Sequence, residues 1–178
     1  MLPQRPAARV FLGVGSNQGD RLSHLRGTEA ELLERQVTVV RRSSVYESPY
    51  LGDGEPQPAY LNAVLEARTK LDPWQLLKVL QAIERCHGRR PASHMRPRPL
   101  DLDILFFAGQ VCSAKSLTLP HPRLAERRFV LEPLAELGAL DSLPTQGLQR
   151  RLQELQLQQK LALFAPWHCS GERREVRF

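Results

Sequence analysis

The order of strand-like and helix-like segments is the feature that most constrains the fold of this 178-residue chain. A short apolar run at 9–14, which ends at a glycine, is typical of a buried strand. Leucines at helical spacing then predict a helix over 21–34. Segments 36–48 and 59–69 alternate and are rich in β-branched residues, which predicts two paired strands joined by a long loop rich in glycine and proline.

A second helix and a further strand follow. Asp72 offers an N-cap with Pro73 at the first helical position, so we predict a helix that stops before Gly88. Residues 88–99 carry four arginines and three prolines, which indicates a loop, and 100–107 (LDLDILFF) is typical of a strand that enters a core. The order strand, helix, strand, strand, helix, strand is that of the split βαβ arrangement. The sequence therefore predicts an α+β, ferredoxin-like sandwich, with helices packed on one face of a mainly antiparallel sheet.

The rest of the chain extends this single domain. We predict a short strand near 110–112, a helix over 129–137 and a helical extension over 146–164, where leucines keep helical spacing among glutamines. The tail at 170–178 is expected to fray. The length suits one domain, with its core at about 9–140, and the sequence contains neither an internal repeat nor a domain linker.

Charge and cysteine content narrow the class of protein. The chain has 25 Lys and Arg against 19 Asp and Glu, a formal net charge of +6. This excess favours an anionic partner, such as a nucleic acid, a nucleotide or an acidic surface, and it also fits a merely solubilising surface. Three cysteines without CxxC spacing indicate neither a disulfide framework nor a zinc site. The apolar run at 10–14 is too short for a signal peptide or a membrane span, so we expect a cytoplasmic protein.

Two aspartates near the start of the strand at 100–107 are the first chemical feature. Asp101 and Asp103 are two residues apart, so both side chains project from the same face of a strand. Adjacent carboxylates repel unless a cation lies between them, and hard oxygen ligands suit magnesium. Taken alone, however, such a pair is more typical of the solvated face of an edge strand.

An arginine-rich loop leads directly into these carboxylates and changes that interpretation. It brings Arg89, Arg90, Arg96 and Arg98 within reach of any ligand held there. Magnesium together with guanidinium groups is the usual surrounding of a polyphosphate during phosphoryl transfer. No Walker A sequence occurs, so a P-loop enzyme is not predicted.

At this point the chain resembles a known family. The stretches FLGVGSNQGD, YESPYLG, YLNAV, AIERCHGR, RPRPLDLDILFF and LTLPHPRLAERRFVLEPLAEL occur in the order and spacing of the 6-hydroxymethyl-7,8-dihydropterin pyrophosphokinases of folate biosynthesis. The resemblance covers about residues 9–140. It implies a transferase that moves pyrophosphate from ATP to the hydroxymethyl group of the pterin and releases AMP.

The resemblance also implies a set of site residues and two magnesium ions. Asp101 and Asp103 would bind both ions, and the expected catalytic residues are Arg89, Arg98, Asp101, Asp103 and His121. The expected ATP-binding residues are Gln81, Glu84, Arg89, Arg98, Ile104, Thr118, His121 and Arg127. The expected pterin-binding residues are Ser48, Pro49, Leu51, Tyr60, Asn62 and Phe129. The partners would be these small molecules, without nucleic acid or membrane, and we expect a monomer.

Several of these residues have simpler interpretations when taken alone. Phe129 and Tyr60 would be core aromatics, and His121 would be an exposed bystander that donates to a phosphate oxygen only in the context of the site. Asn62 is harder to dismiss, because a buried amide needs partners. The turn at 15–17 (GSN) is expected to form the bend and to cap the following helix rather than to contact a ligand.

The chain departs from the family in the arginine-rich loop. Members often carry there a further basic residue and a tryptophan that closes over the substrates, whereas this chain has Pro91, His94 and Met95. Arg90 and Arg96 supply charge, but the added proline stiffens the loop. We therefore expect weaker sequestration of the substrates without loss of the reaction.

Two other classes of protein fit part of the sequence. A ferredoxin-like RNA-binding module would share the fold and the basic charge, but it should show paired aromatics and an RNP-like motif, which the sequence lacks. A phosphohydrolase or glycosyltransferase could use the DxD pair. Such an enzyme would release ADP, phosphate or a sugar-nucleotide product instead of AMP.

Overall fold

The protein is described by a computed structural model over residues 6–52, 55–88 and 96–168. The strands are β1 Ala8–Ser16, β2 Val37–Arg42, β3 Val45–Ser48, β4 Tyr60–Thr69, β5 Asp101–Phe107, β6 Cys112–Ala114, β7 Leu117–Leu119 and β8 Ala162–Ala165. The helices are α1 Arg21–Glu34, α2 Pro73–Cys86, α3 Arg128–Glu136 and α4 Leu148–Gln158, with short 3-10 helices at Leu124–Glu126 and Leu140–Ser142. The predictions for Arg89, Arg90, Pro91, His94, Met95 and the tail at 170–178 lie outside the described residues.

The central sheet confirms the predicted antiparallel arrangement. Its strands lie in the order β5-β1-β4-β3-β8, and each pairing between them is antiparallel. β2 and β3 lie end to end along the same edge of β4, so the strand predicted over 36–48 is broken in two. At the break, Ser43 donates its N–H to the Val64 oxygen (3.0 Å), and its Oγ accepts the Val64 N–H (2.9 Å). The serine side chain thus continues the ladder across the gap.

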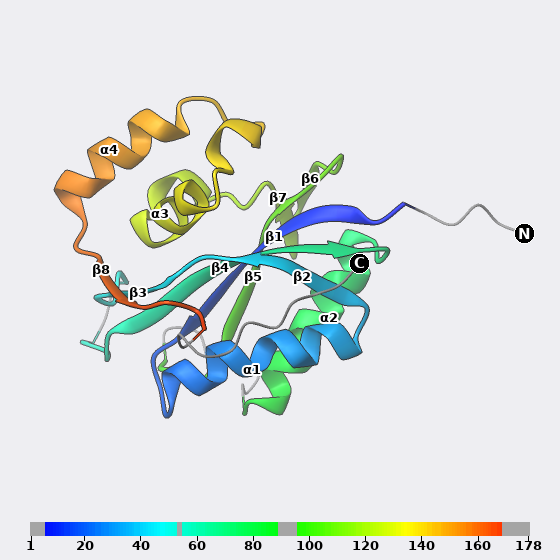
Figure 1. Cartoon of the computed structure of the whole chain (residues 1–178), viewed down its shortest axis with the longest axis horizontal. Helices are drawn as coiled ribbons and strands as arrows, with labels where there is room; N and C mark the ends of the chain where they lie inside the picture. The colour runs from blue at the N-terminus through cyan, green and yellow to red at the C-terminus, as the bar shows by residue number, and fades with distance from the viewer. Residues whose placement is uncertain (1–5, 53–54, 89–95, 169–178) are drawn as a thin grey trace, which may run out of the picture.

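Helices cover both faces of this sheet, which corrects the expectation that they lie on one face (Figure 1). α1 and α2 pack on one face with Val10 and Ile104, whereas α3 and α4 pack on the other with Phe11 and Leu105. Neighbouring residues in β1 and β5 therefore belong to different apolar cores. Strands that are apolar on both faces need cover on both, because each face must be removed from water.

Side chains next to the helices cap the N-terminal ends of α2 and α1. α2 begins with a full capping box, in which the Asp72 carboxylate accepts from the Gln75 N–H (2.9 Å) and the Gln75 side chain accepts from the Asp72 N–H (2.9 Å). α1 is capped by Asp20, which accepts the Ser23 N–H at 3.1 Å. The expectation that the turn at 15–17 caps α1 was therefore wrong.

The second half of the chain differs most from the prediction. The helix expected over 146–164 ends at Gln158, and the residues after it form β8 on the open edge of β3. The short strand expected near 110–112 lies at Cys112–Ala114, where it pairs with β7 as a separate hairpin. No helix in the described part of the chain is both long and apolar enough to cross a membrane.

Candidate active site

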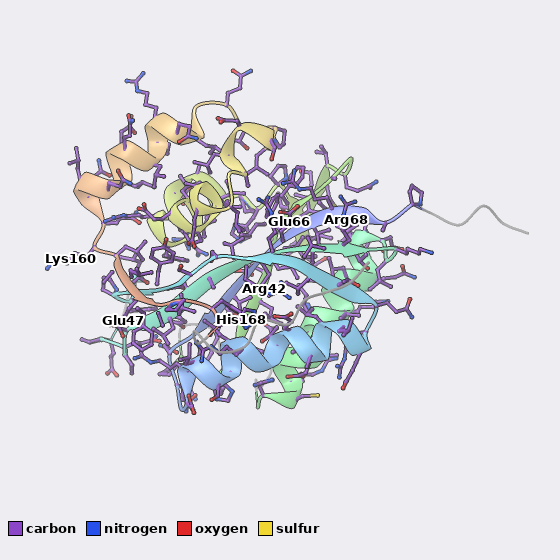
Figure 2. The ribbon with its side chains drawn as sticks, in the orientation of Figure 1. Arg42, Glu47, Glu66, Arg68, Lys160 and His168 are labelled. Carbon is purple, nitrogen blue, oxygen red and sulfur yellow. The ribbon has the colours of Figure 1, made fainter. Side chains whose placement is uncertain are left out.

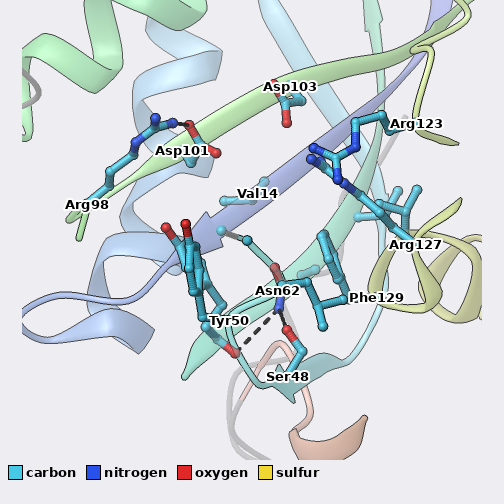
Figure 3. Close-up of a pocket in the computed structure, with 18 of the residues that line it drawn as sticks. Val14, Ser48, Tyr50, Asn62, Arg98, Asp101, Asp103, Arg123, Arg127 and Phe129 are labelled. Atoms are coloured by element: carbon cyan, nitrogen blue, oxygen red, sulfur yellow. Dashed lines mark hydrogen bonds and ion pairs between the residues drawn. The ribbon is translucent and has the colours of Figure 1, made fainter. Parts of the chain in front are cut away.

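A cleft of about 670 Å³ opens on the α3 face of the sheet (Figure 3). It brings together residues from β1, β3, β4, β5 and α3, and from the loops after β3 and before β5. Ten of the predicted site residues line it, namely Ser48, Pro49, Leu51, Tyr60, Asn62, Arg98, Asp101, Asp103, Arg127 and Phe129. The sequence places these residues up to 81 positions apart, so their convergence is a result of the strand order.

The floor of the cleft is set by the strand register. Gly15 of β1 lies opposite Asp101 of β5 on one side and Asn62 of β4 on the other. Because adjacent strands are about 4.8 Å apart, the backbones of Asp101 and Asn62 are separated by roughly 10 Å. Gly13, in the next row of the same face, lies beside Asp103. The cleft therefore has an acidic end and an amide end, with a floor of glycine between them.

The acidic end is held by β5. Asp101 and Asp103 face the cleft, while Leu102 points into the opposite core. Glu84 of α2 is 2% exposed, and its carboxylate accepts the Leu102 N–H at 2.9 Å, between the two aspartates. Arg98 Nη1 donates to Asp101 Oδ1 at 2.7 Å. Burial would lower the pKa of the Arg98 guanidinium, but the charge of Asp101 and its hydrogen bond hold that pKa above the ordinary value.

These two carboxylates suit magnesium in donor type and position. Both offer oxygen atoms on one face of a strand, at the edge of a cleft. Among the described residues, no cluster of three or more His, Cys, Asp and Glu side chains could hold a metal ion. A cation held by Asp101 and Asp103 would therefore take its other ligands from water and substrate, which is the usual habit of magnesium.

Two arginines face the aspartates from the α3 side (Figure 3). Arg127 is the N-cap residue of α3, and Arg123 lies in the turn before it. Burial lowers the pKa of Arg127, and the charge of Arg123 adds to this effect, while Asp103 and Asp101 oppose it. Two guanidinium groups near each other in a partly buried cleft favour an anion that pairs with both.

The amide end offers a slot for a flat polar ring. Asn62 is 6% exposed, and its Nδ2 donates to Ser48 Oγ (3.0 Å) and to the main-chain oxygen of Tyr60 (3.4 Å). Tyr50 stacks on Tyr60 with ring centroids 6.4 Å apart and planes 23° from parallel. Figure 3 shows Tyr50 and Phe129 on either side of Asn62. Aromatic faces with one fixed amide between them match a planar heterocycle with a hydrogen-bonding edge.

His121 lies next to the cleft without lining it. Its backbone N–H donates to the main-chain oxygen of Leu105 (2.9 Å), and its ring Nδ1 accepts the backbone N–H of Arg123 (3.1 Å). Leu105 is the residue that β5 inserts where its register with β1 shifts, so this bulge helps to place the histidine. Burial, together with the charges of Arg127 and Arg123, lowers the pKa of His121 to about 4. At neutral pH the ring is uncharged, and its proton is on Nε2.

Four other predicted residues lie away from the cleft lining. Gln81 is exposed on α2, and Thr118 is exposed on β7, where its Oγ1 donates to the Ala114 oxygen at 3.3 Å. Ile104 is buried in the core beneath α1 and α2. Glu84 supports β5 from below, as described above. Their predicted contacts with the nucleotide remain predictions.

Some residues of the site were not predicted from the sequence. Tyr50 and Arg123 line the cleft, and both belong to motifs quoted in the sequence analysis. Tyr50 directly follows Pro49, and Arg123 lies two residues after His121. Asn17 joins two walls: its Oδ1 accepts the Arg98 N–H (2.7 Å), its N–H donates to the Arg98 oxygen (3.1 Å), and its Nδ2 donates to Gln57 Oε1 (3.2 Å). The usable signal in the sequence was an asparagine directly after a buried strand, because an amide at such a position needs hydrogen-bond partners.

Comparison with known proteins agrees with this geometry. The chain is 43% identical over 129 residues to a Bacillus subtilis protein named 2-amino-4-hydroxy-6-hydroxymethyldihydropteridine pyrophosphokinase, a match that covers 72% of this chain and 77% of the relative. It is 42% identical over 128 residues to the mitochondrial folate synthesis bifunctional protein of Arabidopsis thaliana, of which it spans only 23%. The matched part of the chain thus covers most of the bacterial relative but less than a quarter of the plant one.

A solved structure shows the same fold at low sequence identity. The crystal structure of Plasmodium falciparum HPPK-DHPS A437G with STZ-DHP matches with a TM-score of 0.63 at 13% identity, covering 88% of this chain and 48% of that chain. The family model described as 7,8-dihydro-6-hydroxymethylpterin-pyrophosphokinase (HPPK) matches residues 11–139, which is more than half of the chain. This match, the identity to the bacterial relative and the cleft together show that the chain belongs to the 7,8-dihydro-6-hydroxymethylpterin-pyrophosphokinase (HPPK) family.

Proposed function

We propose that this chain transfers the pyrophosphoryl group of ATP to the hydroxymethyl group of 6-hydroxymethyl-7,8-dihydropterin, giving AMP and the pterin pyrophosphate in folate biosynthesis. The observation that carries the proposal is the row of Asp101, Gly15 and Asn62 across three adjacent strands. It places a carboxylate pair at one end of a cleft and a buried amide at the other. The family of the chain supplies the reaction that such a cleft serves.

The pterin belongs at the amide end. Asn62 Oδ1 can accept a hydrogen bond from the edge of a pterin, and Ser48 Oγ fixes the amide by accepting a hydrogen bond from Asn62 Nδ2 at 3.0 Å. Phe129 and Tyr60 offer ring faces on which the heterocycle stacks. Pro49 and Leu51, which follow β3, complete the wall of this subsite. In this orientation the hydroxymethyl arm extends over Gly15 toward Asp101.

The triphosphate of ATP belongs at the acidic end. Asp101 and Asp103 would hold two magnesium ions, which would neutralise the negative charge of the triphosphate. Arg98 and Arg127 pair with phosphate oxygens that the carboxylates would otherwise repel, and His121 donates from Nε2 as a neutral group. Arg89, which lies outside the described residues, keeps its predicted place in this set.

Catalysis in this arrangement is a matter of position and charge. The pterin hydroxyl attacks the β-phosphorus in line and releases its proton to water. The bond between the β-phosphorus and the oxygen that it shares with the α-phosphate breaks, and AMP leaves with that oxygen. No side chain has to form a covalent intermediate. Glu84 contributes by fixing the Leu102 N–H, so that the two aspartates keep their common face. We infer further that the protein acts as a cytoplasmic monomer with small-molecule partners only.

The rival functions fit the structure less well. An RNA-binding module of this fold class leaves one face of its sheet open for bases, whereas here α3 and α4 cover that face. A phosphohydrolase would need no slot for a flat ring beside the carboxylates. The products separate it from a pyrophosphokinase, because only the latter makes AMP in a pterin-dependent manner.

The proposal is tested by mixing the protein with ATP, magnesium and 6-hydroxymethyl-7,8-dihydropterin and following AMP and the pterin pyrophosphate. The test variant is Asp101→Asn, which keeps the shape of the side chain but removes its charge. The matched control is Asp141→Asn, at an exposed position in a 3-10 helix outside the cleft. We expect pterin-dependent AMP in the wild type and the control, and a loss of about a hundredfold or more in Asp101→Asn. AMP production that does not need the pterin would refute the proposal.

A further inference from the structure

The segment after α4 connects the two faces of the molecule. Residues 159–168, here called the C-terminal strap, leave α4 on the α3 face, pass the edge of the sheet as β8, and end beside α1 (Figure 1). Lys160 and His168 mark its two ends in Figure 2. The strap lies beyond residue 139, where the match to the HPPK family model ends. Its contacts therefore need an explanation of their own.

The first residue of the strap contacts the start of α3. Gln159 Oε1 accepts the Arg128 N–H at 2.8 Å, and the Gln159 main-chain oxygen accepts from Arg128 Nη1 at 2.8 Å. Gln159 Nε2 donates to the main-chain oxygen of Glu126, also at 2.8 Å. The first N–H groups of a helix have no partner inside the helix, and the N-cap residue Arg127 makes no side-chain cap. Gln159 thus caps the N-terminal end of α3 in place of an N-cap side chain, although it lies 31 residues after Arg128 in the chain.

The rest of the strap is fixed to β3 and to the opposite core. β8 pairs with β3 through Val45 and Ala165, and through Glu47 and Ala162, and β3 ends at Ser48. Beyond β8, Trp167 is 4% exposed in the core beneath α1. Arg26 Nε donates to the Trp167 oxygen at 2.6 Å, and Arg26 Nη2 donates to the Pro166 oxygen at 3.1 Å. Because its far end is anchored, the strap can hold Gln159 in place.

Both walls of the amide end of the cleft therefore depend on the strap. Phe129 follows Arg128 directly in the first turn of α3, and Ser48 follows the residues of β3 that pair with β8. We propose that Gln159 is a positioning residue for the pterin: by capping α3 from the C-terminal strap, it fixes the Phe129 ring relative to Ser48 and Asn62. This inference rests on the proposed function, since it assigns the ring contact to a pterin.

The test compares three variants in steady-state kinetics with ATP and 6-hydroxymethyl-7,8-dihydropterin. Gln159→Ala removes the cap, and Gln159→Glu keeps an acceptor for the Arg128 N–H. Gln158→Ala is the matched control, because Gln158 is an exposed glutamine next to the cap. We expect Gln159→Ala to raise KM for the pterin about fivefold, which corresponds to the loss of one helix cap. KM for ATP should change less than twofold, and Gln159→Glu and Gln158→Ala should stay within twofold of the wild type.

The outcomes separate this inference from the proposed function and from a general loosening of the fold. Pterin-dependent AMP in the wild type establishes the reaction, so an unchanged pterin KM in Gln159→Ala overturns only the positioning role. Equal rises in both KM values, or a Gln159→Glu variant as impaired as Gln159→Ala, would also overturn it.

A double-mutant cycle adds a second measurement. In a Phe129→Leu background, Gln159→Ala should change the pterin KM less than twofold, and a full additional effect would contradict the role of the ring.

Discussion

Replacement of Gly15 by alanine separates the stability of the sheet from the use of the cleft. Gly15 is not among the residues with positive φ, so an alanine can keep the extended backbone of β1. A Cβ built there would lie 3.4 Å from Asn62 Oδ1 and 3.7 Å from Tyr60 Cδ1. These are ordinary van der Waals distances, and both neighbours line the cleft. The new methyl group would fit the folded protein and would stand on the floor between Asp101 and Asn62.

The two consequences have opposite signs. A glycine replaced by alanine in a compatible conformation stabilises a protein by about 0.4–1 kcal/mol, because the unfolded chain has fewer conformations. A methyl group pushed into a site already filled by substrate costs about 1–3 kcal/mol, the usual penalty of overpacking. That penalty corresponds to roughly a 5- to 150-fold weaker interaction with the substrate. Gly15→Ala should therefore be at least as stable as the wild type and should bind the pterin more weakly.

The assay is a urea unfolding curve combined with KM for each substrate. Gly27→Ala is the matched control, because Gly27 lies in α1 and its added Cβ would meet nothing within 4 Å. This control should gain up to about 1 kcal/mol in the free energy of unfolding, as expected for a helix, without a change in either KM. An unchanged pterin KM in Gly15→Ala would show that no substrate crosses Gly15. A lower free energy of unfolding in Gly15→Ala would refute the steric argument.

Three further predictions concern the groups that hold the walls. Glu136→Ala removes the carboxylate at the end of α3 that accepts the Ser44 N–H at 2.9 Å, and urea unfolding should show a loss of about 1–2 kcal/mol. Glu84→Ala leaves the Leu102 N–H buried without its acceptor; we expect a loss of about 1–3 kcal/mol, while Glu84→Gln retains most of the stability. The folded-state pKa of His121, about 4, is below the ordinary value of 6.5, so the unfolded state binds the proton first and stability falls as the pH drops from 6.5 to 4. The urea midpoint should therefore decrease less between pH 7 and pH 4.5 in His121→Asn than in the wild type. An equal decrease in both proteins would contradict this account.

Strong local signals made the first half of the fold predictable. The helix predicted over 21–34 has the bounds of α1, and α2 starts at Pro73 as its cap predicts. The apolar spacing of α1 and the capping side chain of α2 are each properties of a few consecutive residues. The strand at 100–107 was also found, since its alternation is local, but the bulge at Leu105 was not. A bulge depends on the register with β1, which a single strand does not encode.

The predictions that failed depend on the surroundings of a segment. Residues 162–165 form β8 because β3 offers an open edge, although Leu163 belongs to the run of leucines from which a helix over 146–164 was predicted. The helices lie on both faces because the second core needs cover, and the expectation of one face took no account of strands that are apolar on both sides. Tertiary context overrides local propensity in each case.

In the candidate site, too, only the arrangement of residues close together in the sequence could be predicted from the residues themselves. The carboxylates of Asp101 and Asp103 and the nearby Arg98 are close in sequence, so local spacing was enough to predict an acidic end with a guanidinium group. The relation of these residues to Asn62 was implied only by family resemblance. It became a physical statement once the pairing of β1 with β4 and β5 was known.

This division bears on how the cleft can support an in-line transfer. Such a reaction requires the hydroxyl of one substrate and the phosphorus of the other at a fixed separation, and an error of about 1 Å is costly. The loops on both sides of the cleft do not fix a distance, but the spacing of three hydrogen-bonded strands is set by the backbone itself. Because Gly15 lies between Asp101 and Asn62, the two ends of the site are separated by two strand spacings and by no side chain. Glu84, at the acidic end, and Gln159, at the amide end, then have only to orient groups whose separation the sheet has already fixed.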